Sequence, residues 1–107
     1  MIVAFSVAPS GTGRADASVH DAVAAAVTVV RQSGLPHRTS SMFTEIEGEW
    51  EEVFAVVRAA TEAVMPFGSR VSLVLKADIR PGYSGELDGK LERLERALGG
   101  VDDDPVI

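Results

Sequence analysis

The chain changes from strand to helix at Thr44-Glu45-Ile46-Glu47-Gly48-Glu49-Trp50-Glu51-Glu52-Val53. Up to Glu47 polar and apolar residues alternate, as they do in a half-exposed strand. From Trp50 onward apolar residues recur at helical spacing instead, and this pattern continues to Val64. Gly48 lies between the two patterns, where a sharp turn favours a residue without a side chain. The stretch therefore predicts a strand followed directly by a helix.

On the N-terminal side of this stretch the sequence predicts two strands and a helix. Residues 2–8 form a short apolar run that ends before a proline, which is typical of a first strand followed by a loop. Apolar residues over 19–30 recur at helical spacing and predict an amphipathic helix. Residues 35–40 and 42–47 flank Ser41, which predicts a tight hairpin or a strand with a bulge.

Toward the C-terminus the sequence predicts a helix, a long strand and a last helix. The first of these helices runs from about residue 49 to 64, and Trp50 is in phase with its apolar stripe, so we expect Trp50 in the core. Residues 70–78 alternate as in a strand. Leucines at helical spacing over 87–98 predict the last helix.

The predicted order of elements is β-α-β-β-α-β with an added C-terminal helix. This order is typical of an α+β, ferredoxin-like two-layer sandwich, in which a four-stranded antiparallel sheet carries helices on one face. We expect a single domain over residues 1–100 and a frayed acidic tail over residues 101–107. The second sheet face stays open unless the last helix or another subunit covers it, and we therefore expect an oligomer.

Strand alternation assigns a mixed set of side chains to this open face. The apolar ones are Ile2, Ala4, Phe43 and Val74, and the polar ones are Ser6, Glu45, Glu47, Ser72, Lys76 and Asp78. Such a mixture is typical of an interface that encloses a polar pocket. The alternative interpretation is that Glu45 and Glu47 are solvent-facing residues of a half-exposed sheet.

The composition narrows the class of partner. Ten lysines and arginines against sixteen aspartates and glutamates give a formal net charge of −6. This balance argues against a nucleic acid or an anionic membrane as the partner, because both select for basic surfaces. The N-terminus has no basic region that would begin a signal peptide, and no apolar run approaches the roughly 20 residues of a membrane span. We expect a cytoplasmic protein.

Few residues suggest catalysis or metal binding. The chain has no cysteine, which excludes thiolate nucleophiles and Cys-ligated metals. The two histidines, His20 and His37, lack an accompanying nucleophile motif and do not give zinc spacing. Gly11-x-Gly13 lacks the third glycine of a dinucleotide fingerprint and the lysine of a P-loop. We expect no enzymatic activity, no metal and no cofactor.

Four short segments carry a resemblance to a known family. They are Phe5-Ser6-Val7-x-Pro9-x-Gly11, Thr44-x-Ile46-Glu47-Gly48-Glu49, Arg70-Val71-x-x-x-Leu75-Lys76-x-Asp78-x-Arg80 and Leu87-Asp88-Gly89-Lys90-Leu91. In this order they resemble the small thiamine-binding protein family, over residues 2 to about 98. The resemblance implies a ferredoxin-like domain that assembles as a homodimer or as a dimer of dimers. It also implies binding of thiamine, or of its hydroxymethylpyrimidine portion, in transport or salvage.

Matched position by position, the resemblance implies a set of binding residues. They are Ser6, Thr44, Glu47, Lys76, Asp78 and Arg80. Glu47 and Asp78 rank first, because a carboxylate can balance the thiazolium charge or accept from the amino group of the pyrimidine. Glu45 shares their face but lacks a family match, and we expect it to be solvated.

The sequence thus favours a non-catalytic carrier, buffer or sensor of a small cationic or pyrimidine ligand, held on the open sheet face at a subunit interface. Two alternatives stay open. One is a structural or regulatory homo-oligomerisation module without a ligand. The other is a small dimeric ferredoxin-like enzyme in which His37 or Glu47 acts.

Overall fold

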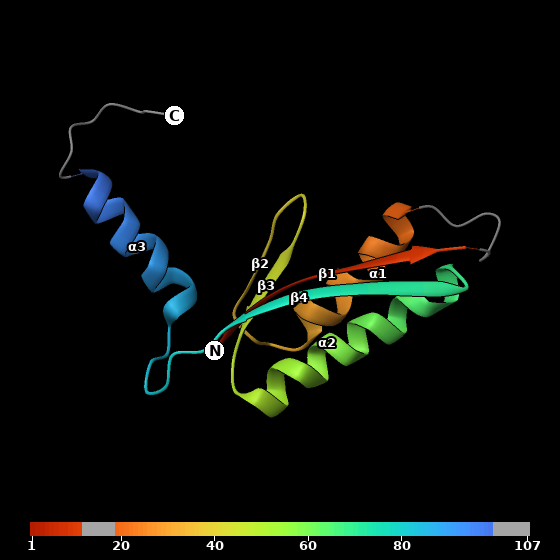
Figure 1. The fold of residues 1–107 in the computed structure, drawn as a ribbon, viewed down its shortest axis with the longest axis horizontal. Helices are drawn as coiled ribbons and strands as arrows, with labels where there is room; N and C mark the ends of the chain where they lie inside the picture. Colours follow the sequence, from red (N-terminus) through yellow and green to blue (C-terminus); the bar gives the residue numbers. More distant parts are fainter. Residues whose placement is uncertain (12–18, 100–107) are drawn as a thin grey trace.

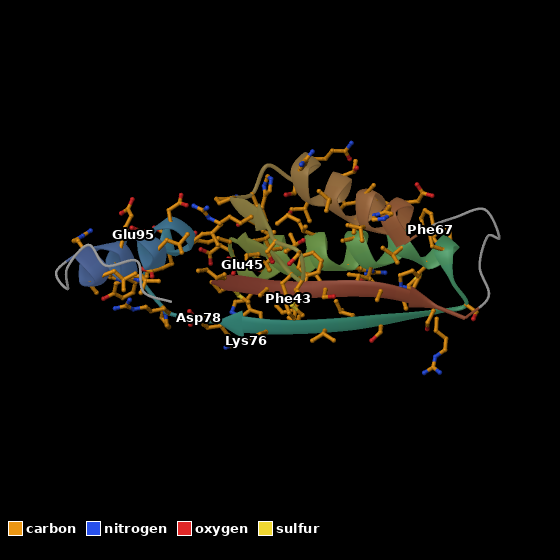
Figure 2. The ribbon with its side chains drawn as sticks, turned by 90° about the horizontal axis from the view of Figure 1, so that it is seen from above. Phe43, Glu45, Phe67, Lys76, Asp78 and Glu95 are labelled. Carbon is orange, nitrogen blue, oxygen red and sulfur yellow. The ribbon has the colours of Figure 1, made fainter. Side chains whose placement is uncertain are left out.

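The computed structural model describes residues 1–11 and 19–99, and its sheet and helices form two layers (Figure 1). The elements are β1 (Ile2–Ser10), α1 (Val19–Gln32), β2 (His37–Thr39), β3 (Thr44–Glu47), α2 (Trp50–Val64), the 3-10 helix η1 (Met65–Phe67), β4 (Arg70–Asp78) and α3 (Glu86–Gly99). The sheet is antiparallel throughout, with the strand order β2-β3-β1-β4. Helices α1 and α2 lie on one side of it (Figure 2). The predicted ferredoxin-like sandwich is confirmed.

The core lies between the sheet and these two helices. Val3 and Phe5 of the central strand β1 pack beside Ile46 of β3, and Val30 of α1 and Val53 of α2 cover them. All five are buried. Because side chains alternate along a strand, the neighbours of these residues on β1 and β3 project from the opposite, open face.

Strand β1 is longer than the sequence predicts. It continues through Pro9 to Ser10, so the prediction of a loop beginning at the proline was wrong. Strand β3 pairs with β1 only from Ile2 to Phe5, whereas β4 pairs with β1 along its whole length. Beyond Phe5, β1 has a single neighbouring strand, and a proline is tolerated where one edge of a strand is unpaired.

The predicted hairpin forms with a turn of several residues. The Ser40 hydroxyl accepts the N–H of Phe43 at 3.2 Å, and the Ser40 N–H donates to the Phe43 carbonyl at 2.9 Å. This closed turn shortens both strands relative to the predicted ranges 35–40 and 42–47.

Helix α2 begins one residue later than predicted, after a capping interaction in which the Glu52 carboxylate accepts the Glu49 N–H at 3.0 Å. Trp50 is 52% exposed and stacks on Phe54, with ring centroids 5.4 Å apart. The prediction that Trp50 packs in the core was wrong. The buried stripe of the helix is centred on other residues, namely Val53, Val57, Ala60 and Val64, and Trp50 lies at the edge of that stripe.

Helix α3 extends away from the two-layer body instead of covering the open sheet face (Figure 1). The radius of gyration is 16.4 Å, against about 13 Å for a compact domain of this length. Leu87 is buried against the body, but Leu91, Leu94 and Leu98 are 43%, 54% and 58% exposed. The predicted acidic tail, residues 101–107, lies outside the described residues, as do Gly13 and its loop.

Candidate functional site

One transverse row on the open sheet face carries three charged side chains. Arg38 of β2 lies opposite Glu45 of β3, Glu45 lies opposite Ala4 of β1, and Ala4 lies opposite Lys76 of β4. Because directly paired residues project from the same side of a sheet, all four belong to one face. The methyl group of Ala4 is the smallest side chain of the row. It therefore leaves space above the sheet between the Glu45 carboxylate and the Lys76 ammonium group.

A cavity of about 270 Å³ lies over this row, between the end of the sheet and α3. Its lining residues are Ile2, Ala4, Glu45, Lys76, Asp78, Leu87 and Leu91. Figure 2 shows Glu45, Lys76 and Asp78 at the end of the sheet next to α3. The cavity therefore combines two carboxylates and one ammonium group with aliphatic side chains, a lining typical of a small-molecule site.

Glu47 holds the first turn of α3. Its Oε2 accepts the N–H of Glu86 at 2.7 Å, and its Oε1 accepts the N–H of Leu87 at 3.1 Å. These N–H groups have no partner within the helix, and a carboxylate at a helix N-terminus is favoured by the helix dipole. Glu47 is only 6% exposed. Both of its oxygens are thus occupied by the backbone of α3, whose Leu87 side chain lines the cavity.

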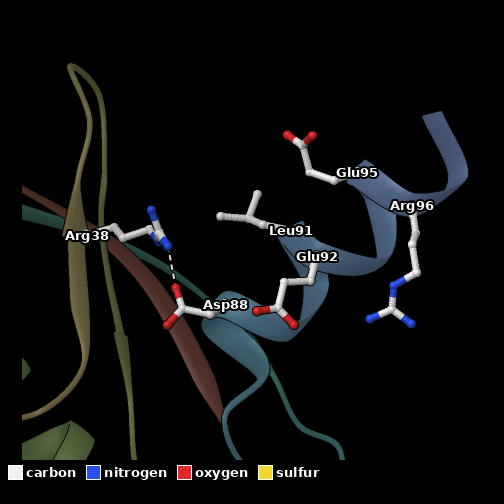
Figure 3. A pocket seen from close by; sticks show the side chains of 6 residues that line it. All are labelled: Arg38, Asp88, Leu91, Glu92, Glu95 and Arg96. Atoms are coloured by element: carbon white, nitrogen blue, oxygen red, sulfur yellow. Dashed lines mark hydrogen bonds and ion pairs between the residues drawn. The ribbon is translucent and has the colours of Figure 1, made fainter. Parts of the chain in front are cut away.

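Ion pairs attach the same end of α3 to the body. Arg38 of β2 pairs with Asp88, and Figure 3 shows its guanidinium reaching that carboxylate at the edge of a groove of about 560 Å³. Arg80, in the loop after β4, lies 3.9 Å from the buried Glu86 carboxylate, which also accepts from Arg93 of the same helix at 2.6 Å. The cavity wall formed by α3 is therefore fixed by contacts with β2, with β3 and with the loop after β4.

The structure separates the other residues that the family resemblance implies. Ser6 lies on the open face opposite Val74, but it does not line the 270 Å³ cavity. Thr44 pairs with Phe5 and so belongs to the helix-covered face. Arg80 follows β4, and its guanidinium lies 3.6 Å from the centre of the Tyr83 ring. Of the six implied residues, Lys76 and Asp78 line the cavity, and Glu47 supports its wall.

Glu45 was missed by the sequence analysis. It was expected to be solvated; it is half-buried and lines the cavity together with Lys76 and Asp78. Its parity with Lys76 placed both residues on the open face. Parity alone does not give the strand register that sets Glu45 and Lys76 on either side of Ala4. It also does not give the position of α3 next to them.

Two broader features of the described residues bear on the class of site. Among residues 1–11 and 19–99, no group of three histidines, aspartates or glutamates is placed to hold a metal ion. None of the helices in these ranges combines the length and the apolar character needed to cross a bilayer.

Fold and cavity together define a small ferredoxin-like protein with a polar pocket on its open sheet face. The chain belongs to the thiamine-binding protein family, whose model matches residues 3–95. It is 48% identical over 99 residues to the UPF0045 protein Mb1933 of Mycobacterium bovis, covering 92% of this chain and 94% of that one. It is 36% identical to the UPF0045 protein sll0230 of Synechocystis, covering 92% and 79% of the two chains.

Solved structures show the same fold. A domain of unknown function from Bacillus cereus superposes with a TM-score of 0.76 at 29% identity, covering 86% of each chain. A protein from Thermotoga maritima, named as a candidate in thiamine biosynthesis or salvage, superposes with a TM-score of 0.72 at 22% identity. That match covers 87% of this chain and 96% of the other. At this identity the likeness is one of fold alone.

Proposed function

We propose that the protein is a non-catalytic, cytoplasmic carrier, buffer or sensor that binds thiamine or hydroxymethylpyrimidine in the cavity over Ala4. The observation that carries the proposal is the meeting of Glu45, Lys76 and Asp78 in one cavity, in a chain that belongs to the thiamine-binding protein family.

The chemistry of the lining suits this class of ligand. Thiamine carries a permanent positive charge, and the two carboxylates and one ammonium group of the cavity leave one net negative charge. A carboxylate accepts hydrogen bonds from an amino group, and an ammonium group donates to a ring nitrogen, so Glu45 and Lys76 address opposite edges of an aminopyrimidine. Leu87 and Leu91 add apolar surface to the cavity.

The same lining supports binding over turnover. Among the described residues around the cavity there is no histidine, serine or threonine that would serve as a base or a nucleophile. His37 lies on the edge strand β2, where its Nδ1 is 2.9 Å from the Leu35 carbonyl oxygen, and it is exposed. In this proposal the two carboxylates and the ammonium group of the cavity serve to recognise the ligand by charge and hydrogen bonds.

A homodimer or homotetramer is part of the proposal. Ile2, Ala4 and Val74 on the open sheet face and the exposed leucines of α3 form apolar surface that α1 and α2 do not cover. Surfaces of this kind on a small domain mark interaction sites. A second copy over this face would also close the open side of the cavity. The same exposed leucines favour the second candidate function, a homo-oligomerisation module without a ligand.

Glu45→Gln is expected to weaken binding of thiamine and of hydroxymethylpyrimidine by about tenfold or more, because a hydrogen bond to a charged group contributes about 1.5–3 kcal/mol. Isothermal titration calorimetry measures the change. Glu51→Gln, on the exposed surface of α2, is the matched control and should bind like the parent. Absence of heat and of a thermal shift with the parent protein at millimolar ligand would contradict the proposed function.

Leu94→Glu is expected to convert the assembly to monomers, because it places a charge in the apolar stripe of α3 that the second copy would bury. Sedimentation velocity measures the mass. Ala59→Glu introduces the same charge on the exposed surface of α2 and should leave the assembly intact. A monomeric parent protein would refute the oligomer, and an oligomer that binds neither ligand would favour the ligand-free module.

A further inference from the structure

We infer that Ala4 is a specificity-determining residue of the cavity, and that its small side chain admits a planar heteroaromatic ring lying flat on the sheet between Glu45 and Lys76. The inference rests on the proposed function and goes beyond it, because it names the part of the ligand that the cavity recognises and the residue that sets its shape.

The strand register fixes the width of this slot. Glu45 and Lys76 are the direct neighbours of Ala4 on β3 and β4. Neighbouring strands lie about 4.8 Å apart, so the backbones that carry the two charged side chains are about 10 Å apart. A side chain longer than a methyl group at position 4 would rise into the space between them. With alanine the space stays free above the sheet.

The two flanking charges are available to a ligand. Within residues 1–11 and 19–99, the side chains of Glu45 and Lys76 make no hydrogen bond or ion pair, in contrast to those of Glu47 and Arg38, which are bound to α3. A ring that lies over Ala4 meets an acceptor on the β3 side and a donor on the β4 side.

The ends and the top of the slot also restrict its occupant. In the adjacent row of the open face the larger Ile2 replaces Ala4 as the central residue, between Glu47 and Asp78, and its side chain also lines the cavity. Leu87 and Leu91 of α3 add apolar side chains to the lining. The occupant that fits is flat and carries an amino donor on one edge and a ring acceptor on the opposite edge. The aminopyrimidine ring has these properties.

The chain supplies a matched control in Ala8. It lies on the same strand and projects from the same face, opposite Ser72, but it does not line the cavity. It is exposed, so enlarging it tests the effect of added bulk on the face without filling the slot.

The experiment compares Ala4→Val, Ala4→Leu and Ala8→Leu with the parent by calorimetric titration of hydroxymethylpyrimidine and of thiamine. Far-ultraviolet circular dichroism and sedimentation velocity verify the fold and the assembly. Ala4→Leu is expected to bind both ligands at least about tenfold more weakly, since overfilling a packed space is strongly unfavourable. Ala4→Val, whose side chain suits a strand, should lose less affinity than Ala4→Leu, and Ala8→Leu should bind like the parent.

Parent-like affinity in folded Ala4→Leu overturns the inference and leaves the proposed function standing. An equal loss in Ala8→Leu also overturns it, because the effect then comes from the face as a whole. A parent protein that binds neither ligand overturns the proposed function and this inference with it.

Discussion

Glu47→Gln is expected to loosen the first turn of α3 and to lower the free energy of its local unfolding by about 1.5–3 kcal/mol, the contribution of hydrogen bonds to charged groups. Glutamine keeps the shape of the side chain, but its NH2 group cannot accept the backbone N–H that the carboxylate oxygen accepts. It also removes a negative charge from the N-terminal end of the helix. Native-state hydrogen exchange measures the effect, and the amides of Glu86 and Leu87 should exchange faster in the variant.

Glu45→Gln is the matched control for this experiment. It makes the same substitution two residues earlier on β3, at a side chain with no bond to α3, and exchange at the α3 amides should stay as in the parent. Parent-like exchange in Glu47→Gln would contradict the capping role. The comparison also separates the two hypotheses for Glu47, because a direct ligand contact predicts weaker thiamine binding without release of α3.

Gly68→Ala is expected to lower the global free energy of unfolding by about 2–3 kcal/mol, in the upper range for an overfilled site. A Cβ atom at position 68 would lie 2.6 Å from the carbonyl oxygen of Ser10 and 2.9 Å from its nitrogen. Both are backbone atoms, and the same carbonyl accepts the Ser69 N–H at 3.0 Å. The clash is therefore relieved only by separating the start of β4 from the end of β1. Urea unfolding should show a lower midpoint at unchanged slope.

Gly99→Ala serves as the comparison for this substitution. Apart from its chain neighbours and the backbone of its own helix, no heavy atom of the described residues lies within 4 Å of the position that its Cβ would occupy. The free energy of unfolding should therefore stay within about 0.5 kcal/mol of the parent value. Equal urea midpoints for Gly68→Ala and Gly99→Ala would show that β4 accommodates the added methyl group.

The ferredoxin-like fold was predictable because its information is local. The change of period at Gly48 agrees with the end of β3 at Glu47 and the beginning of α2 at Trp50. The bounds of β4 follow from the alternation over residues 70–78 alone. Each of these signals depends on neighbours a few residues away, and the order of the elements then leaves few topologies.

The candidate site was harder to predict because it depends on contacts between distant parts of the chain. The hydrogen bonds from α3 to Glu47 connect residues that are separated by 39 and 40 positions in the sequence. Contacts at this separation leave no periodic pattern in the sequence. The match of Glu47 and Gly48 to the family pattern does not tell whether Glu47 contacts a ligand or caps a helix. Glu45 has no family match, and only the register that sets it across Ala4 from Lys76 gives it a place in the cavity.

Leu87 takes part both in the cap of α3 and in the cavity, because its N–H donates to Glu47 and its side chain lines the cavity. Docking of α3 and ligand binding in the cavity would therefore be thermodynamically linked. If the proposed ligand binds between the sheet and Leu87, it contacts the docked helix and would stabilise docking by RT ln(1 + [L]/Kd). By reciprocity, whatever holds the first turn of α3 in place raises the affinity for the ligand by the same factor. Ligand binding would then also restrain the helix that carries the exposed Leu94 and Leu98.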